Sequence, residues 1–239
     1  MLKATSINPS TNFLEGTILL FNKPIEWSSF DLVKKIRSTI KKSYNLKKIK
    51  VGHAGTLDPL ADGLLIVCTG KFTKKISVIQ NYPKKYIGTM FLGATTASND
   101  LETEINKRYP TSHINDDLIH GSCNNFKGLI YQKPPIFSAL KKNGKRLFEY
   151  ARKGESVKIK SRQVHVKGFK ITNIKMPEID FEVTCSKGTY IRSLVRDYGH
   201  HLNSGALLKN LTRTDIGPFN LSNAYTIEQF TEHIFSNLT

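Results

Sequence analysis

The stretch 52–63 restricts the fold of this chain more than any other, because it places three glycines, a histidine, two aspartates and a proline within twelve residues. It follows a basic segment with helical periodicity and precedes the apolar run 64–68, which predicts a buried strand. Asp58 precedes Pro59, and a residue before proline is pushed toward extended backbone geometry. The sequence therefore predicts a shaped loop, and not a linker, that holds the Asp58 carboxylate and the His53 imidazole in place.

Hydrophobic periodicity along the rest of the chain predicts strands and helices that do not alternate strictly. Strands are expected at 17–21, 64–68, 85–93, 164–173 and 180–185, and helices at about 30–40, 71–80, 116–125, 146–152, 190–202 and 226–235. Turn and loop signals dominate 94–100 and 126–135. This order favours an α+β fold with a mixed, largely antiparallel sheet over a doubly wound fold.

Length and composition point to one soluble domain. With 239 residues the chain is long enough for a single core, so one domain over 16–239 is expected after a flexible, unpatterned stretch 1–15. No apolar run approaches the roughly 18 residues of a membrane span, and the start lacks the apolar core of a signal peptide, so a cytoplasmic location is expected. The three cysteines are odd in number and form no Cys-x-x-Cys pair, which predicts free thiols at Cys68, Cys123 and Cys185.

The positive charge is concentrated in two segments. Residues 34–50 contain eight basic side chains and no acidic one, and residues 141–170 contain eleven basic side chains and two acidic ones. Together the two segments carry the entire formal net charge of +17. A coding bias toward lysine would scatter the charge, whereas two local patches are typical of contact with phosphates. The chain is therefore expected to bind a nucleic acid, of a kind that charge alone does not specify.

The loop 52–63 resembles the catalytic loop of the pseudouridine synthases, in particular that of the bacterial tRNA pseudouridine-55 synthases, the TruB family. That loop reads Gly-His-x-Gly-x-Leu-Asp-Pro-x-Ala-x-Gly. The matching positions here are Gly52, His53, Gly55, Leu57, Asp58, Pro59, Ala61 and Gly63. A lone Asp-Pro or Gly-His pair is ordinary turn chemistry, but agreement along the whole loop is specific.

Four further segments resemble the same family, in the same order along the chain. They are the opening strand motif at 16–24, Lys85-Tyr86, the stretch 135–152, and the motif Cys-Ser-Lys-Gly-Thr-Tyr-Ile-Arg at 185–192. The stretch 135–152 resembles the inserted, RNA-gripping thumb of this family, expected here at about 136–165. The resemblance covers roughly 16–235 and implies the pseudouridine synthase catalytic fold, a mixed sheet with flanking helices and an active site in a cleft across it.

One departure from the longer bacterial members concerns the end of the chain. Those members continue into a small RNA-binding domain of the PUA type, but only about a dozen residues follow Tyr225 here. A short form without a PUA domain is therefore expected. Its grip on RNA would come from the catalytic core and the basic thumb, so binding is expected to be more sensitive to salt than in a PUA-bearing relative.

The resemblance implies an isomerase that converts uridine to pseudouridine at position 55, in the T arm of tRNA, on a base flipped out of its loop. The reaction breaks the N1–C1′ bond, joins C1′ to C5 and removes the C5 proton, without a redox step or a group donor. No cofactor is therefore expected, and the histidines lack metal-ligand spacing, which predicts no catalytic metal. A carboxylate nucleophile suffices, and Asp58 is the candidate. Attack on the base, attack on C1′ and an elimination at the sugar remain open.

Tyr86, Arg192 and His53 complete the set of residues that the resemblance implies around Asp58. A nearby Arg192 favours an ionised carboxylate against desolvation, and its planar fork can orient both oxygens. Tyr86 offers a ring that stacks on the target base and a hydroxyl for removal of the C5 proton. His53 is assigned to the RNA, because a planar side chain next to the nucleophile can fill the gap left by an extruded base.

Five further residues are predicted to contact the substrate. They are Lys23, Tyr190, Leu211, Lys141 and Lys145. The first three match pocket positions of the family, and plain core packing is the alternative for Leu211. The two lysines of the thumb are expected to contact phosphates.

An RNA-binding folding assistant is the alternative function from another class. It would open and re-close the tRNA elbow, with modification incidental or lost, but a pure binder has no need of a carboxylate such as Asp58 facing a phosphate-rich strand. A guide-RNA-dependent enzyme is a third alternative, although such relatives normally carry the PUA domain. We therefore expect a stand-alone tRNA-modifying enzyme, a monomer without guide RNA or an obligate protein partner.

Overall fold

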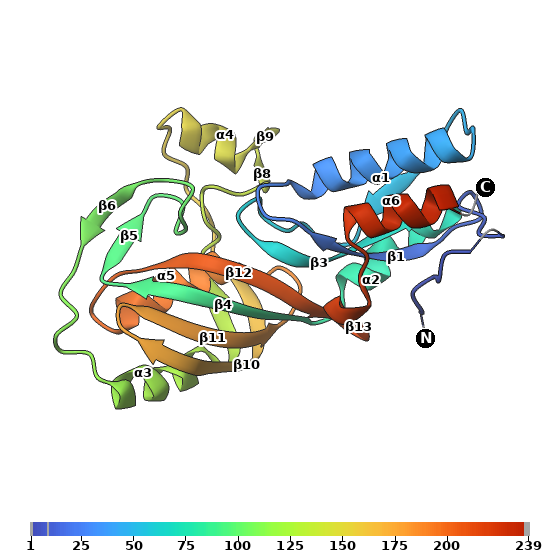
Figure 1. The fold of residues 1–239 in the computed structure, drawn as a ribbon. Helices are drawn as coiled ribbons and strands as arrows, with labels where there is room; N and C mark the ends of the chain where they lie inside the picture. The colour runs from blue at the N-terminus through green and yellow to red at the C-terminus, as the bar shows by residue number, and fades with distance from the viewer. Residues whose placement is uncertain (1, 9, 237–239) are drawn as a thin grey trace. The chain divides into compact units, whose positions relative to one another are not determined.

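The computed structural model describes residues 2–8 and 10–236 of the chain. The chain divides into two compact units: the first consists of Met1–Tyr86 with Thr212–Thr239, and the second of Ile87–Leu211. The boundaries fall within strands β4 (Lys84–Leu92) and β12 (Ala206–Ile216), so each of these strands contributes residues to both units (Figure 1). The single catalytic domain expected from the sequence stays a prediction.

The sheet of the first unit is built around β3. Its strands are β1 (Ile18–Lys23), β2 (Val51–His53), β3 (Asp62–Thr69), the end of β12, and β13 (Phe219–Asn220). Strands β1 and β2 pair with β3 in antiparallel register, and β12 runs parallel to β3 with Thr212 opposite Asp62. Strand β13 pairs with β12 in antiparallel register. Strand β3 is buried along almost its whole length, as an unbroken apolar run predicts.

Helix α1 (Ser29–Ser43) begins where two residues cap each other. The Ser28 hydroxyl accepts a hydrogen bond from the Asp31 amide at 3.1 Å, and the Asp31 carboxylate accepts one from the Ser28 amide at 3.0 Å. The apolar face of α1 shares a core with β1, β3 and the C-terminal helix α6 (Ile227–Ser236), which lies beside α1 (Figure 1). In this core the rings of Phe21 and Phe230 meet edge to face at 5.0 Å.

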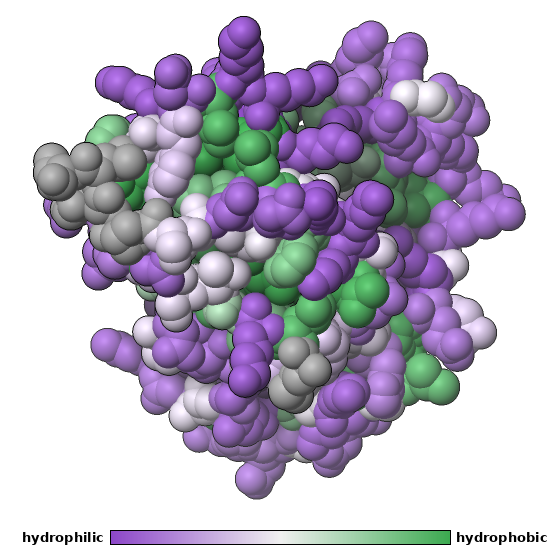
Figure 2. Space-filling model, turned by 90° about the vertical axis from the view of Figure 1, so that its right-hand side faces the viewer, coloured by the Kyte–Doolittle hydropathy of each residue, from purple (hydrophilic) through white to green (hydrophobic). Residues whose placement is uncertain are grey.

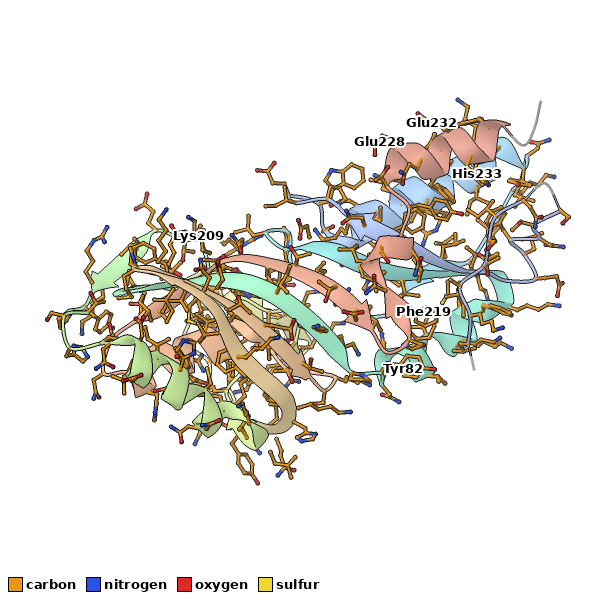
Figure 3. All side chains as sticks on the ribbon, turned by 60° about the horizontal axis from the view of Figure 1, so that its bottom comes forward. Tyr82, Lys209, Phe219, Glu228, Glu232 and His233 are labelled. Atoms are coloured by element: carbon orange, nitrogen blue, oxygen red, sulfur yellow. The ribbon has the colours of Figure 1, made fainter. Side chains whose placement is uncertain are left out.

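Three short helical segments complete the first unit. They are η1 (Gly70–Lys75), α2 (Ile76–Gln80) and η3 (Leu221–Asn223). Just beyond α2, the ring of Tyr82 lies 6.4 Å from that of Phe219 in β13 (Figure 3).

On the face shown in Figure 2, hydrophilic side chains dominate the surface and hydrophobic ones gather in smaller patches between them.

The described part of the N-terminal stretch is packed against the first unit. Thr5 donates its amide to the carbonyl of Ile18 at 2.7 Å, and its hydroxyl accepts from the Ile18 amide at 3.0 Å. Ile7 and Phe13 are 5% and 2% exposed and belong to the core shared by α1 and β3. Two isolated apolar side chains thus contact the core from a polar, unpatterned segment, and the flexibility expected of 1–15 stays a prediction.

The second unit contains a sheet with the strand order β12-β4-β11-β10-β7. The hairpin of β10 (Arg162–Lys175) and β11 (Glu178–Cys185) is antiparallel, and β7 (Gly128–Gln132) adds to β10 in antiparallel register. The helices of this unit are α3 (Asp116–Ser122), η2 (Cys123–Phe126), α4 (Leu147–Arg152) and α5 (Ile191–His201). Two small hairpins join β5 (Ala94–Thr96) to β6 (Ile105–Arg108) and β8 (Lys141–Lys142) to β9 (Lys145–Arg146).

Aromatic rings fill the core beneath α5. Tyr198 of α5 lies 5.5 Å from Phe126 and 5.5 Å from Phe169, and Phe169 lies 5.9 Å from Phe181. The Tyr198 hydroxyl donates to the carbonyl of Ile119 at 2.5 Å, and burial raises its pKa. These contacts hold α5 against β10 and β11, and they fix the helix that carries Arg192.

The structure confirms the predicted α+β fold with a mixed, largely antiparallel sheet. Two interpretations of local pattern were wrong. The stretch 126–135 contains β7, because a long-range partner, β10, outweighs its glycine and proline signals, and 94–100 contains β5. The helices expected at 71–80 and 116–125 each divide into an α-helical and a 3-10 part.

The three cysteines are buried, free thiols, as predicted. Burial raises the pKa of the Cys68 thiol to about 12, so this cysteine is not a nucleophile. Within residues 2–8 and 10–236, none of the helices has the length and apolar character needed to cross a membrane.

Candidate active site

The loop that carries Asp58 connects two paired strands of the first unit. Strand β2 ends with His53 opposite Val67, and β3 starts at Asp62, so the segment 54–61 closes an antiparallel pair. Gly63 has a φ of +101°, and a Cβ there would collide with the backbone of Arg213 in β12. Glycine is therefore required where β3 leaves the loop and β12 lies against it.

The residues on both sides of Asp58 are fixed by hydrogen bonds to the first residue of α1 and to the turn that precedes this helix. The Ser29 hydroxyl accepts from the Leu57 amide at 2.8 Å and donates to the Leu57 carbonyl at 3.1 Å. The Glu26 amide donates to the carbonyl of Pro59 at 2.7 Å. Asp58 itself is half-buried. Its carboxylate is thus presented by a backbone that is held immediately before and immediately after it.

Arg213 of β12 holds this loop through hydrogen bonds to its backbone carbonyls. The sequence alone did not predict a role for Arg213. Its side chain is 1% exposed. The guanidinium donates to three backbone carbonyls, those of Leu64 at 2.7 Å, Gly55 at 3.1 Å and Thr56 at 3.3 Å. A buried arginine with carbonyl partners is rare, because arginine is normally exposed or paired with a carboxylate. Nothing in the local sequence distinguishes it from the surface lysines and arginines of the chain.

Lys23 is fully buried at the end of β1. Its ammonium donates to the carbonyls of Pro24 at 2.8 Å and Trp27 at 2.7 Å. Burial lowers its pKa to about 8, although the charges of Asp62 and Asp58 favour the protonated form. The sequence predicted a substrate contact for Lys23. The structure places its ammonium inside the first unit, where its charge acts on the two aspartates of the loop.

His53 and Tyr86 also belong to the first unit. Burial lowers the pKa of His53, and the positive charge of Arg213 lowers it further, whereas a hydrogen bond with the Gly55 backbone opposes the shift. His53 is therefore a neutral imidazole at pH 7, which suits stacking or hydrogen bonding better than attraction to phosphate. Tyr86 lies in β4 and is 8% exposed.

Arg192 lies in the first turn of α5, in the second unit, and is almost fully buried. Its Nη1 lies 3.4 Å from Oδ2 of Asp100 and donates to the carbonyl of Ser98 at 3.2 Å. Its Nη2 donates to the carbonyl of Phe137 at 2.9 Å. Asp100 was not among the predicted residues, because 94–100 gave only turn signals. The structure thus connects Arg192 to Phe137, close to the start of the thumb.

Gln132 fixes the residue that precedes α5. Its side-chain amide donates to the Tyr190 carbonyl at 3.0 Å and accepts from the Tyr190 amide at 2.8 Å. Gln132 is 1% exposed. The guanidinium of Arg162 lies 5.0 Å from the centre of the Tyr190 ring. The end of β7 therefore orients the beginning of the helix that carries Arg192.

The predicted thumb forms a small basic hairpin followed by α4. Lys141 and Lys145 lie on its two strands and are exposed, and the Lys142 ammonium donates to the carbonyl of Lys158 at 2.7 Å. Leu211, by contrast, is buried beside Gly88 within the second unit. Lys141 and Lys145 are exposed, as a contact with phosphates requires, and the burial of Leu211 suits a pocket wall as well as core packing, so these three assignments stay predictions.

The predicted residues are thus divided between the two units. The first unit contains Lys23, His53, Asp58 and Tyr86, and the second contains Lys141, Lys145, Tyr190, Arg192 and Leu211. Among the described residues, no group of three or more histidine, cysteine, aspartate or glutamate side chains is arranged to hold a metal ion.

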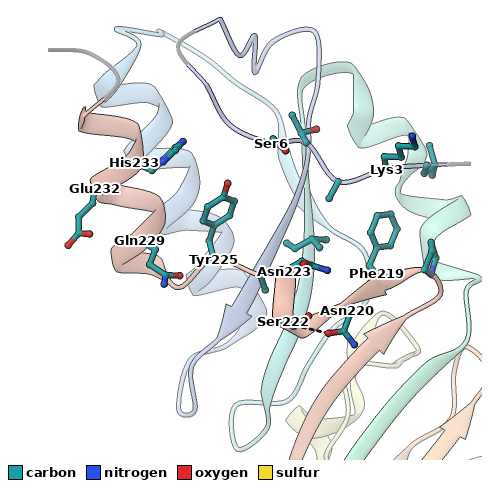
Figure 4. A pocket seen from close by; sticks show the side chains of 16 residues that line it. Lys3, Ser6, Phe219, Asn220, Ser222, Asn223, Tyr225, Gln229, Glu232 and His233 are labelled. Atoms are coloured by element: carbon teal, nitrogen blue, oxygen red, sulfur yellow. Dashed lines mark hydrogen bonds between the residues drawn. The ribbon is translucent and has the colours of Figure 1, made fainter.

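The first unit also has a wide hollow of about 1030 Å³ that none of the predicted residues lines (Figure 4). Its walls come from the N-terminal segment, β13, η3 and α6, and include Lys3, Tyr225, Gln229 and His233. His233 is hydrogen-bonded to the Ile7 carbonyl at 2.8 Å, which ties α6 to the N-terminal segment. These contacts explain how the chain ends pack, and they add no chemistry to the loop.

Comparison with known proteins identifies the family. The model named "TruB family pseudouridylate synthase (N terminal domain)" matches residues 41–191, more than half of the chain. The chain belongs to the TruB family. The matched range includes His53, Asp58, Tyr86 and Tyr190, and it ends one residue before Arg192.

Relatives of this TruB family member are similar over nearly their whole length. The chain is 56% identical over 223 residues to a protein of Flavobacterium johnsoniae named tRNA pseudouridine synthase B, covering 93% of this chain and 97% of the relative. It is 51% identical over 221 residues to a protein of the same name from Phocaeicola vulgatus, covering 92% and 94%.

Solved structures extend the similarity to the fold. A chain in the crystal structure of a Cbf5-Nop10-Gar1 complex matches 99% of this chain with a TM-score of 0.69 and 25% identity. A chain in an H/ACA RNP bound to a substrate RNA containing 2′-deoxyuridine matches 92% with a TM-score of 0.66 and 25% identity. The TruB family member spans 65% and 53% of the length of these two solved chains.

Proposed function

We propose that this chain is a tRNA pseudouridine synthase that isomerises the uridine at position 55, in the T arm of tRNA. The observation that carries the proposal is the backbone around Asp58, where Leu57 and Pro59 are both hydrogen-bonded and a carboxylate is held in a fixed place. The relatives named tRNA pseudouridine synthase B, similar over more than nine-tenths of this chain, support uridine in tRNA as the substrate.

Asp58 acts as the nucleophile. A nucleophilic carboxylate has to be ionised, and desolvation on binding RNA works against ionisation. Lys23 counters that effect, because its buried ammonium interacts with the charges of Asp58 and Asp62. The fixed backbone removes the entropy cost of positioning the carboxylate for attack.

The remaining roles follow the motifs in which the residues stand. Arg192 supplies the guanidinium that favours an ionised carboxylate and orients its oxygens. Tyr86 stacks on the target base, and its hydroxyl assists removal of the C5 proton. His53, uncharged at pH 7, occupies the gap left by the extruded uridine. The exposed Lys141 and Lys145 bind phosphates, and Tyr190 and Leu211 shape the pocket for the base.

The enzyme works in the cytoplasm as a monomer, without guide RNA or protein partner. Support for a stand-alone enzyme comes from the relatives named for tRNA, of which the chain covers up to 97%. The solved chains from the H/ACA RNP and from the Cbf5-Nop10-Gar1 complex extend well beyond the matched region.

Tritium release tests the function and the nucleophile together. The substrate is a T-arm RNA that carries 5-tritiated uridine, and the proteins are wild type, Asp58→Ala and the control Asp117→Ala, in which an exposed carboxylate of α3 is removed. Release is expected from wild type and the control only. Tritium release by Asp58→Ala would show that Asp58 is not the nucleophile. No release from any of the three, with tight tRNA binding retained, would favour the folding-assistant function.

A further inference from the structure

One face of helix α1 carries a row of basic side chains that the loop chemistry does not use. Its members are spaced by three and four residues, so they lie on the same side of the helix. We call them the basic stripe: Lys34, Arg37, Lys41 and Lys42. With Ser38 and Leu46 they line a hollow of about 430 Å³ on the surface of the first unit.

The basic stripe keeps most of its charge at the surface of the first unit. Lys34, Lys41 and Lys42 are exposed, and in the described part of the chain none of them forms an ion pair. Lys35, which lies next to the stripe on α1, differs in that it interacts with a carboxylate of α6. Hydrogen bonds from its own amide and from Thr226, together with the charge of Lys35, lower the pKa of Glu228, which projects from α6 (Figure 3). Among the described residues, Glu228 thus interacts with Lys35. Asp31 interacts with Lys34 at one end of the stripe, because hydrogen bonds from Ser28 and then the charge of Lys34 lower the pKa of Asp31.

Helix α1 is attached to the Asp58 loop and to the strand that precedes this loop. At its start, the Ser29 hydroxyl forms two hydrogen bonds with the backbone of Leu57. Further along, Arg37 donates from Nη2 to the carbonyl of Val51 in β2 at 2.9 Å. The basic stripe is therefore held at a fixed distance from Asp58. At about 1.5 Å per residue, the axis from Ser29 to Lys41 measures roughly 18 Å.

We propose that the basic stripe binds the phosphodiester backbone of the same RNA whose uridine reaches Asp58, at a part of the RNA outside the target loop. This inference rests on the proposed function. Lysine ammonium groups attract phosphates without reading base sequence, which suits a grip on a stem. The stripe is roughly 12 Å long at about 1.5 Å per residue, enough to follow several phosphates of one strand.

The packing of α1 favours RNA over an anionic membrane. A helix that binds a membrane surface inserts its apolar face between lipids. The apolar face of α1, with Leu32, Ile36 and Ile40, is completely buried in the core of the first unit. Outside this core α1 presents mainly charged and polar side chains, with the exposed ring of Phe30 near its start, so a hydrated polyanion suits the stripe better than a membrane.

A double variant with a matched control tests the stripe. Lys34→Gln/Lys41→Gln removes two charges from it, and Lys74→Gln/Lys175→Gln removes two exposed charges elsewhere. For a full-length tRNA, the Kd of the stripe variant is expected to rise roughly tenfold, and the slope of log K against log salt to fall by about 1 to 2. The increase appears in KM and not in kcat. The control is expected to stay within about twofold of wild type.

The outcomes separate this inference from the proposed function. If wild type releases tritium and the stripe variant binds tRNA like the control, the stripe is not an RNA contact and only this inference fails. If wild type releases no tritium but the stripe variant loses tRNA affinity, the proposed function fails and the stripe stands. Loss of binding to phosphatidylserine vesicles, with tRNA affinity unchanged, would assign the stripe to membranes and overturn the inference.

Discussion

Arg192 and Asp100 form an ion pair inside the second unit, with Nη1 of the arginine 3.4 Å from Oδ2 of the aspartate and both side chains less than one-tenth exposed. The same nitrogen donates to the carbonyl of Ser98. Removing a charged group from water costs free energy, and only attraction to a well-placed partner of opposite charge offsets this cost. Asp100 therefore stabilises the guanidinium of Arg192, the last residue of the motif at 185–192, although the two residues are 92 positions apart in the sequence.

Asp100→Asn should destabilise the protein by about 3 kcal/mol, because it leaves a buried guanidinium with less compensating charge. Urea unfolding followed by circular dichroism measures the change. Glu102→Gln is the control, since its pair with Arg152 at 3.6 Å is exposed and should contribute less than about 1 kcal/mol. Equal losses for both variants would mean that Asp100 does not hold Arg192 through its charge.

Lys23 should make stability depend on alkaline pH. Its pKa is about 8 in the folded protein and 10.5 when unfolded, so the unfolded state binds more protons between these values. The free energy of unfolding should therefore rise with pH through this window, by about 2 to 3 kcal/mol at pH 10 relative to Lys23→Met. Below pH 8 the cost of burying the charge is fully present.

Two measurements check the behaviour of Lys23. Urea unfolding of wild type and Lys23→Met between pH 7 and pH 10 gives the difference in stability, and parallel curves would contradict a lowered pKa. In wild type, NMR of carbon-13-labelled lysine should show one ε-carbon signal that titrates near pH 8 and is missing from Lys23→Met.

Gln132→Leu should lower both stability and turnover. The leucine leaves the amide and the carbonyl of Tyr190 without their side-chain partner, at a cost of about 1 to 3 kcal/mol. Because Tyr190 precedes α5, the start of the Arg192 helix shifts and kcat falls. Gln163→Leu, an exposed position in β10, serves as control and should change the free energy of unfolding by less than about 0.5 kcal/mol. An unchanged kcat in Gln132→Leu would limit Gln132 to packing.

The parts of the molecule that the sequence predicted have local determinants. Ser28 and Asp31 are three residues apart and cap α1, and Pro59 directly stiffens Asp58. The apolar run of β3 needs no knowledge of its neighbours to be assigned as a buried strand. For the same reason the predicted helix at 190–202 agrees with α5, Ile191–His201, to within one residue at each end.

The supporting residues were missed because each acts across a long separation. Gln132 bonds to a residue 58 positions away, and Arg213 bonds to residues 157 and 158 positions away. Their neighbours in sequence give no periodic or motif signal that distinguishes them from surface glutamine and arginine. Only the pairing of β12 with β3 brings Arg213 within hydrogen-bonding distance of the loop backbone.

Arg213 provides the sharpest test of how the Asp58 loop is positioned. Arg213→Lys keeps the positive charge but loses the fork that serves the carbonyls of Gly55, Thr56 and Leu64. A displacement of the loop by about 1 Å should lower kcat on T-arm RNA by roughly 10- to 100-fold, with KM within about threefold.

Arg37→Lys, which affects a single bond to Val51, should change kcat less than threefold by the same argument. NMR titration of His53 separates charge from geometry: its pKa should stay low in Arg213→Lys and rise in Arg213→Met, where the cation is gone. A normal kcat in folded Arg213→Lys would show that the loop holds Asp58 without the fork.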